Sequence, residues 1–437
     1  MAAGRYIDAV CVVMVLAALL VTALFSHGEE LGLERIVDAD AEESRGTAYF
    51  TDNDQRGSWD AGRATQIRLN GERSSVSGGG AYVYEGNVVI SSAGKYRVSG
   101  ELYDGSIVVD TDGDAKVWIM LDGVTISCYD GACLRVEQAD KVFLTLADGS
   151  ENRLSSAFAE KAEGLGVDGA VFSRDDLTIN GSGSLKVVSA TQHGIACNDE
   201  LVITGGEIRV EAARDALHAN DGLRVKEAAL SLDAYDDGIA LTGEESELYI
   251  ESGRMDIRCT DNALSAEDRI HISGGEISID AGNDGISAVG SVDISGGTLA
   301  IRAYDDAIHS DTSVTVSGGR IDIQDCFEGI EAVVIDISGG EIAICPIDDG
   351  MNATRKDGMH TQIRISGGDV RIVNRDAVGT DGLDANGDIL ITGGRILIDL
   401  GEYEGNSAID CTGELSVTGG EIVTDMPLPP AADTPSA

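Results

Sequence analysis

The stretch from Ala281 to Ile330 reads AGNDGISAVGSVDISGGTLAIRAYDDAIHSDTSVTVSGGRIDIQDCFEGI and repeats one pattern. Each repeat has an acidic or amide pair before Gly or Ala and then Ile, followed by small and β-branched residues and a Gly-Gly pair that leads into an alternating apolar run. We term the residue before that Gly or Ala the anchor. The anchors Asp284, Asp306 and Glu328 are 22 residues apart each time (306 − 284 and 328 − 306), which indicates a structural period.

The same anchor recurs along most of the chain, at Asp168, His193, Asp215, Asp237, Asn262, Asp349, Asp381 and Ser407. Within one repeat the apolar residues alternate over short runs, as strands with one buried face do; they are Ile272, Ile277, Ile279, Ala281, Ile286 and Ala288. A fixed period of this size is typical of a solenoid, in which each repeat packs only against its neighbours. We therefore predict an all-β fold, a single-stranded parallel β-helix with coils of about 22 residues and three short strands per coil.

Composition limits the partners of the chain. Its 31 Lys and Arg against 76 Asp and Glu give a formal net charge of −45. Nucleic acid and anionic membrane surfaces would be repelled, so neither is expected as a partner. Cations, or polyanions bridged by cations, are favoured instead.

The chain divides into four predicted segments. Residues 1–27 contain an uncharged run of 16 residues, Val10 to Phe25, which is short for a spanning helix and long for a signal-peptide core. We predict a membrane anchor with the N-terminus inside, or alternatively a cleaved secretion signal; both place the body outside the cell, at the cell surface. Residues 28–66 are expected to form an acidic linker or stalk, 67–423 the β-helix, and 424–437 a disordered tail.

Two stretches interrupt the repeat. Residues 148–166 are predicted to be a surface excursion that could carry a binding function, because loops often do. Residues 354–361 lengthen a later coil.

Several phrases resemble a known family. They are DGAVFSRDDLTINGSGSLKV from Asp168, HGIACNDELVITGGEIRVEA from His193, DDGIALTG from Asp236 and EGIEAVVIDISGGEI from Glu328. Over about residues 67–423 the chain resembles the bacterial carbohydrate-binding domain-containing β-helix family described from cellulolytic clostridia. The resemblance implies a right-handed parallel β-helix, similar in structure to pectate lyases, that binds calcium and acidic or cellulosic polysaccharide without established lyase activity.

The acidic turns are the candidate metal site. Coils of a β-helix stack about 4.8 Å apart, so residues at one register form a ladder. Two like charges at that spacing repel by about 3.5 kcal/mol at an effective dielectric of 20, and a calcium ion between coils could bind carboxylates from both. The predicted calcium ligands are Asp236, Asp237, Asp261, Asp284, Asp305, Asp306, Glu328, Glu331, Asp348, Asp349, Asp381 and Asp384. Alternatively, Asp and Asn occupy such turns because they cap nearby backbone amides, without any metal.

The position three residues after each anchor is predicted to point outward. Toward the C-terminus it becomes polar or acidic, at Glu331, Asn352, Asp384 and Asp410. With the neighbouring anchors it makes the densest acidic surface that the sequence predicts. The same row carries His218 and His309, which we interpret as isolated surface imidazoles.

The remaining candidates are a few possible ligand-binding side chains and the cysteines. The candidate ligand-binding residues are Tyr235, Tyr304, Phe327 and Asn352. Cys197, Cys259 and Cys411 fall on inward registers and are interpreted as core residues. Whether Cys128 pairs with Cys133, or Cys326 with Cys345, the spacing leaves open.

These observations favour a non-catalytic cell-surface protein that binds acidic or plant cell-wall polysaccharide through calcium. Polygalacturonate, as in pectin, fits calcium bridging better than cellulose does, because the few aromatic residues predict no continuous stacking platform. One alternative is a structural adhesin or stalk that calcium rigidifies. Another is a polysaccharide lyase, which is not favoured because its candidate proton acceptors are scattered across registers: Arg224, Arg269, Arg302 and Arg364.

Overall fold

The computed structural model describes residues 49–157, 166–356, 358–376, 378–401 and 403–428. The chain divides into two compact units, Met1–Thr51 and Asp52–Ala437, and the second contains every strand described below. The predicted anchor or signal segment 1–27 lies outside the described residues, as do most of the predicted linker and residues 429–437 of the predicted tail. Among the residues that are described, no helix is long and apolar enough to cross a membrane.

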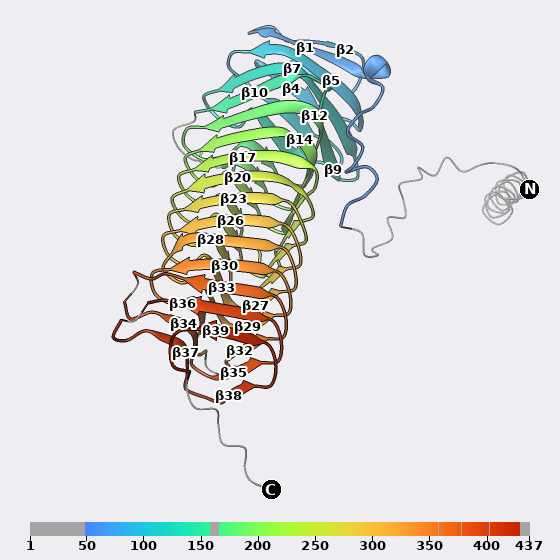
Figure 1. The fold of residues 1–437 in the computed structure, drawn as a ribbon. Coiled ribbons are helices and arrows are strands. Elements are labelled where there is room, and N and C mark those ends of the chain that lie inside the picture. The colour runs from blue at the N-terminus through green and yellow to red at the C-terminus, as the bar shows by residue number, and fades with distance from the viewer. Residues whose placement is uncertain (1–48, 158–165, 357, 377, 402, 429–437) are drawn as a thin grey trace, which may run out of the picture. The chain divides into compact units, whose positions relative to one another are not determined.

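The second unit is a parallel β-helix of about 13 turns with coils of about 24 residues (Figure 1). This confirms the predicted fold class. The coils around Asp284 and Asp306 keep the 22-residue period, and longer coils elsewhere, such as the one that contains residues 354–361, raise the mean.

Three ladders of parallel strands run along the β-helix. The first follows the anchor turns and contains β4 (Asn87–Ile90), β6 (Ile107–Asp110), β8 (Leu134–Gln138), β11 (Gly169–Ser173), β13 (His193–Cys197), β15 (Leu217–Ala219), β18 (Ile239–Leu241), β21 (Leu264–Ala266), β24 (Ile286–Ala288), β27 (Ile308–Val316), β29 (Ile330–Ile337), β31 (Met351–Ala353), β34 (Asp381–Ala385) and β37 (Ser407–Cys411).

The second ladder comes next along each coil and shares β27 and β29 with the first. Its other strands are β5 (Gly94–Leu102), β7 (Lys116–Cys128), β9 (Lys141–Leu146), β12 (Asp176–Ser189), β14 (Glu200–Ala212), β16 (Gly222–Val225), β19 (Glu247–Ile250), β22 (Arg269–Ile272), β25 (Ser291–Ile294), β32 (Gln362–Ile365), β35 (Asp388–Ile391) and β38 (Leu415–Val417).

The third ladder precedes the next anchor turn and includes the later parts of β5, β7, β12 and β14. Its other strands are β1 (Thr65–Gly71), β10 (Glu151–Ser156), β17 (Ala228–Ala234), β20 (Gly253–Cys259), β23 (Glu276–Ala281), β26 (Thr298–Ala303), β28 (Arg320–Cys326), β30 (Glu341–Pro346), β33 (Asp369–Val373), β36 (Arg395–Asp399) and β39 (Glu421–Thr424).

The first coils also contain antiparallel pairs. Strand β2 (Ser75–Ser77) runs antiparallel to β1, and β3 (Ala81–Tyr84) runs antiparallel to β4. A short 3-10 helix, η1 (Ala61–Arg63), precedes β1.

The core consists of stacks of like residues from successive coils. Ile286, Ile308, Ile330 and Met351 are register partners across β24, β27, β29 and β31, and each is fully buried. The predicted inward residues of the repeat, from Ile272 to Ala288, are buried as well. The alternating pattern therefore packs as the sequence predicts.

The Gly-Gly pair turns the chain at the corner between the second and third ladders. A Cβ atom on Gly296 would lie 2.4 Å from the carbonyl oxygen of Ser273 on the preceding coil, and Gly297 has a φ of 91°. The first position thus requires close approach of two backbones, and the second requires a left-handed conformation that favours glycine.

The folded unit begins earlier than predicted. The side chain of Asp54, which falls in the predicted linker 28–66, is buried against β9 and β12. Its Oδ1 atom accepts a hydrogen bond from Thr178 Oγ1 at 2.6 Å and lies 3.0 Å from Lys141 Nζ. Residues 52–66 are therefore part of the β-helical unit and not of a linker.

The predicted excursion 148–166 is also partly wrong. Its first half forms β10, which pairs in parallel with β7 and β12 and buries Leu154. Residues 158–165 lie outside the described residues. The sequence of this stretch departs from the fixed repeat, so the periodic pattern did not predict the strand β10.

Candidate functional site

The anchor side chains hydrogen-bond one coil to the next. Asn262 Oδ1 accepts the backbone N–H of Asp284 at 3.1 Å, and Asp284 Oδ1 accepts that of Asp306 at 3.2 Å. Asp349 Oδ1 accepts the N–H of Asp381 at 2.8 Å. This is the capping role that turn residues of this kind can play without a metal. In the carboxylate anchors Asp284 and Asp349 it occupies one oxygen and leaves the other for a different partner.

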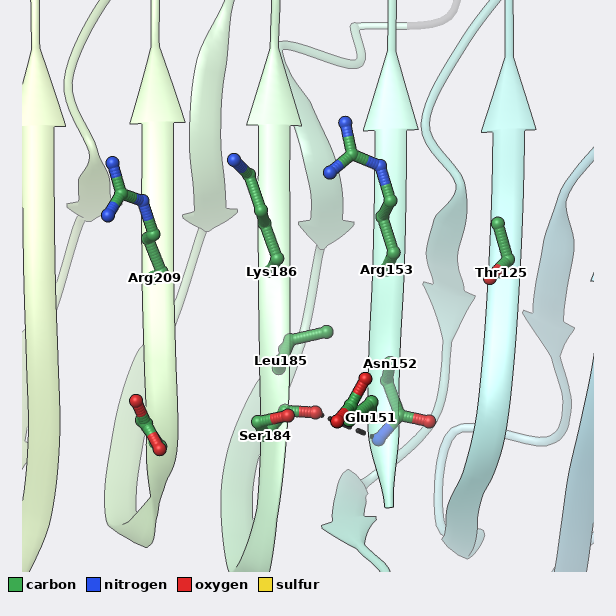
Figure 2. A pocket seen from close by; sticks show the side chains of 9 residues that line it. Thr125, Glu151, Asn152, Arg153, Ser184, Leu185, Lys186 and Arg209 are labelled. Atoms are coloured by element: carbon green, nitrogen blue, oxygen red, sulfur yellow. Dashed lines mark hydrogen bonds between the residues drawn. The ribbon is translucent and has the colours of Figure 1, made fainter.

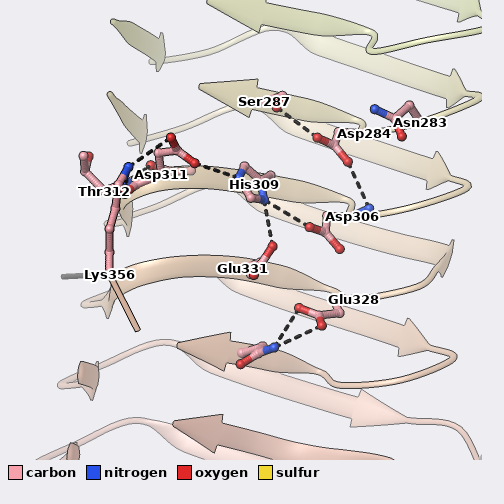
Figure 3. Close-up of polar contacts among 12 residues, drawn as sticks. Asn283, Asp284, Ser287, Asp306, His309, Asp311, Thr312, Glu328, Glu331 and Lys356 are labelled. Carbon is pink, nitrogen blue, oxygen red and sulfur yellow. Dashed lines mark hydrogen bonds and ion pairs between the residues drawn. The ribbon is translucent and has the colours of Figure 1, made fainter. Parts of the chain in front are cut away.

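The second oxygens face the row three positions later. Asp284 Oδ2 accepts a hydrogen bond from the Ser287 hydroxyl at 2.9 Å, and Asp306 Oδ2 lies 3.1 Å from His309 Nδ1 (Figure 3). Register pairing places this row on successive coils as predicted, from Ser287 through His309, Glu331, Asn352 and Asp384 to Asp410. The row therefore continues the acidic surface outward from the anchors.

His309 is not an isolated imidazole, so that interpretation is wrong. Its Nδ1 atom lies 2.8 Å from Glu331 Oε2 as well as near Asp306, and its Nε2 atom lies 3.4 Å from Asp311 Oδ1. Hydrogen bonds to Asp306 and Glu331 raise the pKa of His309 to about 11. The side chain is thus an imidazolium that neutralises part of the acidic row, and Lys356 Nζ adds a second cation 3.0 Å from Asp311 Oδ2.

His218 is paired in the same way. Its Nδ1 atom lies 2.8 Å from Asp215 Oδ2, and its ring stacks on that of His193 with centroids 4.5 Å apart. Burial raises the pKa of Asp215, but hydrogen bonds from His193 and His218 outweigh it and hold the pKa well below its usual range. Asp215 lies on the coil of His218, whereas His193 lies on the preceding coil, so the sequence of one coil does not show the whole group.

Three predicted ligands near the centre come together. Carboxylate oxygens of Asp236, Asp237 and Asp261 lie within 4.8 Å of one another. Burial and then the charge of Asp215 raise the pKa of Asp237 to about 7. Asp305, in contrast, is exposed beside its buried neighbour Asp306.

The largest group lies toward the C-terminus. We define the C-terminal acidic cluster as Glu328, Asp348, Asp349, Asn352, Asp381 and Asp384. Oxygens of its first three carboxylates lie within 4.8 Å of one another, and Asn352 Nδ2 donates to both oxygens of Glu328 at 3.0 Å. Asn352 and Asp384 are direct register partners on β31 and β34.

Two oxygens in this cluster lack a partner. Asn352 Oδ1 and Asp381 Oδ1 are buried, and neither has a hydrogen-bond partner among the described residues. Asn352 is only 9% exposed. A buried polar atom without a partner is destabilising and uncommon, and these two oxygens are free to accept a hydrogen bond or to face a positive charge.

Burial raises the pKa values of carboxyl groups in the cluster. It is the main reason that the pKa of Glu328 is raised to about 8, that of Asp349 to about 7 and that of Asp381 to about 6. Neighbouring carboxylates raise each pKa further. A nearby positive charge would favour the ionised form of these carboxyl groups at neutral pH.

Exposed apolar side chains flank the cluster on successive coils. Tyr304 is 82% exposed, Phe327 42% and Ile347 55%. The backbone amide of Phe327 donates to Asp305 O, and that of Ile347 to Phe327 O. Tyr235 is exposed but lies three coils before Tyr304, so it does not join this row. Ile347 was missed by the sequence reading, although it precedes Asp348 and Asp349 as Tyr304 precedes Asp305 and Asp306.

Three of the four candidate proton acceptors have structural partners, whereas Arg302 is exposed and forms no ion pair within 4.0 Å among the described residues. Arg224 lies 2.6 Å from Glu200, Arg269 lies 3.7 Å from Asp293, and Arg364 pairs with Asp336. All seven cysteines in the described residues are free thiols. Neither open disulfide pair is formed, and of the three predicted core cysteines Cys197 is fully buried while Cys259 and Cys411 are partly buried.

The chain is similar to known proteins. The model of a family described as "Carbohydrate-binding domain-containing protein" matches residues 84–329 and 242–373. A protein of that description from Acetivibrio thermocellus is 38% identical over 136 residues, which are 30% of this chain and 48% of that protein. The chain thus matches about half the length of this relative.

A solved structure is also similar. The gadolinium derivative of a polysaccharide lyase-like protein from C. thermocellum aligns with 82% of this chain and 99% of its own, at 21% sequence identity and a TM-score of 0.35.

Proposed function

Because its family model spans residues 84–373, the chain belongs to the family of carbohydrate-binding domain-containing proteins, and we propose that it binds acidic plant cell-wall polysaccharide through calcium, without catalysis. The C-terminal acidic cluster is the proposed site. The observation that carries the proposal is the pair of unpartnered buried oxygens, Asn352 Oδ1 and Asp381 Oδ1.

The donor set suits calcium. Calcium takes carboxylate and amide oxygens and accepts several of them at once, and the cluster offers such oxygens from three successive coils. Asp349, Asn352, Asp381 and Asp384 would hold the ion. When bound, the ion supplies positive charge toward which a uronate carboxylate can turn, so that an acidic protein can hold an acidic glycan.

The exposed row beside the cluster supports a sugar ligand. Tyr304, Phe327 and Ile347 give an apolar strip next to convergent polar groups, which is the usual combination in small-ligand sites. The strip extends over three coils, longer than the sequence predicts, so cellulose is a second candidate glycan. Polygalacturonate remains the first, because only an acidic glycan uses the cation directly.

The non-catalytic part of the proposal is supported by the pairing of three of the four arginines that could accept a proton in a lyase. Arg224, Arg269 and Arg364 each pair with a carboxylate. The uncharged run Val10 to Phe25 supports export and attachment at the cell surface.

A second candidate function is a stalk or adhesin that calcium rigidifies. It is favoured by the anchor side chains, which hydrogen-bond each coil to the next and so make the acidic row part of the scaffold. In that case calcium would stabilise the β-helix without any glycan being bound.

Retention on insoluble polysaccharide separates the two functions. The full chain is applied to polygalacturonate and to cellulose, each with calcium and with chelator, together with the variants Asp381→Asn, Asn352→Ala and, as a control outside the cluster, Asp280→Asn. The proposal expects calcium to increase retention on polygalacturonate, and it expects both cluster variants to lose this increase while the control keeps it. Calcium-dependent melting with no retention on either polymer would instead support the stalk.

A further inference from the structure

A row of cations lies on the third ladder, away from the anchor turns. Arg153 on β10, Lys186 on β12 and Arg209 on β14 are register partners on successive coils, and their side chains extend in the same direction (Figure 2). The row ends at Thr125 on one side and Ser231 on the other. Three adjacent cations are a local exception in a chain with a net charge of −45.

A second row lies two residues earlier on the same strands. Glu151, Ser184 and Glu207 are register partners of one another, and residues two apart on a strand share a face. The two rows border a hollow with a volume of about 380 Å³. The side chains of Ser184 and Thr125 in its lining are small and leave this space open. It is therefore a polar site with donors along one side and acceptors along the other.

Part of this charge is already paired. Glu211 Oε1 lies 2.8 Å from Lys186 Nζ and 2.9 Å from Arg209 Nε. On the coil of Arg153 the register position of Glu211 belongs to Ser155, so Arg153 has no such acid beside it. Among the described residues, Arg153 forms no ion pair within 4.0 Å.

The two glutamates of the hollow are also available. Neither Glu151 nor Glu207 forms an ion pair within the described part of the chain, and Glu151 is exposed. The hollow thus presents a guanidinium group and two carboxylates that have not already satisfied one another.

We infer that this hollow binds a carboxylate-bearing saccharide directly, without a metal ion. The guanidinium of Arg153 suits a carboxylate because its planar fork can donate two parallel hydrogen bonds, and Lys186 adds a point charge on the next coil. Sugar hydroxyl groups would donate to Glu151 and Glu207. This inference rests on the proposed carbohydrate-binding function and adds a second surface to it.

The two glutamates decide between classes of anion. Inorganic phosphate has no ring of hydroxyl donors, and the closely spaced charges of nucleic acid or of a heavily sulfated polymer would be repelled by Glu151 and Glu207. A uronate has one carboxylate and several hydroxyl donors on one ring. It therefore matches both rows of the hollow at once.

Titration calorimetry of the full chain with trigalacturonate in chelator tests the inference. The wild type is expected to bind, and Arg153→Ala to weaken binding by about tenfold or more, as loss of a charged hydrogen bond does. Arg302→Ala is the matched control, because Arg302 is also an exposed arginine of the third ladder. A second variant, Glu151→Leu, has a side chain of similar size without a hydrogen-bond acceptor and should weaken binding by removing the hydroxyl contacts.

Three outcomes would overturn the inference. They are no binding of trigalacturonate by the folded wild type in chelator, equal affinity of Arg153→Ala and wild type, and binding of a sulfated oligosaccharide in place of trigalacturonate. None of them touches the calcium-dependent retention that depends on Asp381. If calcium does not increase retention on polygalacturonate but trigalacturonate still binds in chelator, only the calcium site is contradicted.

Discussion

His309 Nδ1 lies 2.8 Å from Glu331 Oε2 on the next coil and 3.1 Å from Asp306 Oδ2 on its own. One imidazolium thus links the acidic rows of two coils (Figure 3). Without it, these two carboxylates would face each other across the strand spacing, where like charges repel. His309 is therefore part of what makes a dense acidic surface compatible with a stacked fold.

Replacing this imidazolium should destabilise the β-helix. We expect His309→Gln to lower the free energy of unfolding by about 1.5–3 kcal/mol, the usual worth of hydrogen bonds to charged groups. Since the folded pKa of His309 is about 11 and the unfolded one about 6.5, this contribution is complete below about pH 6.5. It is lost as the pH rises through 11.

Urea unfolding of the wild type and the variant at pH 6 and pH 10.5 measures the effect. His360→Gln is the control, because its partner Asp388 lies 3.3 Å away in an exposed pair, and exposed pairs contribute little. Equal stability of His309→Gln and wild type at pH 6 would contradict the role given to His309.

Calcium should stabilise the protein more as the pH rises. The pKa values of Glu328 and Asp349 are about 8 and about 7 in the folded chain, against about 4 when unfolded. Between pH 4 and 8 the folded chain thus holds more protons than the unfolded chain, and without calcium its stability falls with rising pH. Calcium must displace these protons, so its stabilising effect grows through the same window.

Thermal unfolding with calcium and with chelator at pH 5.5, 7 and 8.5 gives the dependence directly. The increase in Tm on adding calcium should be smallest at pH 5.5 and largest at pH 8.5, and Asp381→Asn should reduce it. An increase that is the same at all three pH values would exclude the cluster as the calcium site.

Adding a methyl group should lower the stability much more at Gly296, in the Gly-Gly corner, than at Gly131, which lies outside it. Gly296→Ala places a Cβ atom 2.4 Å from Ser273 O, whereas Gly131→Ala meets no atom within 4 Å. The first change should lower the free energy of unfolding by about 1–3 kcal/mol, as overpacking does, and the second should have little effect. Chemical denaturation of the two variants compares them, and similar midpoints would show that the corner can move apart without strain.

The repeat predicted most of the fold, because the anchor, the alternating apolar residues and the Gly-Gly pair each recur at a fixed interval. It placed Glu331, Asn352 and Asp384 in one row, as the register confirms, although Asn352 is buried and not exposed as predicted. It could not assign the partners of His309, since these depend on side-chain rotamers, both within its own coil and toward Glu331 on the next. It did not predict the strand β10, because the sequence around this strand departs from the repeat interval.

Asp54 illustrates the other limit of the sequence. Nothing around it repeats, and its hydrogen-bond partner Thr178 lies 124 residues further along the chain. A contact of this kind leaves no local pattern. The acidic composition of residues 28–66 therefore suggested a linker, although the end of that segment is folded.

Asp54 should be among the most sensitive acidic residues of the chain. Its side chain is 2% exposed, and that of its partner Lys141 is 12% exposed. Asp54→Ala would leave the ammonium group of Lys141 without this partner in a largely buried position, and removing one member of a buried pair costs about 3–5 kcal/mol. Asp52→Ala, at an exposed position two residues earlier, should change the stability little.

The double variant Asp54→Ala with Lys141→Met separates charge from packing. If the uncompensated ammonium group is the cause, the double variant should recover much of the stability that Asp54→Ala loses, because the effects of contacting residues do not add. The free energies of unfolding of both single variants and the double variant, obtained in urea, complete the cycle. Additive losses would show that Asp54 acts through Thr178 and the backbone around it, and not through Lys141.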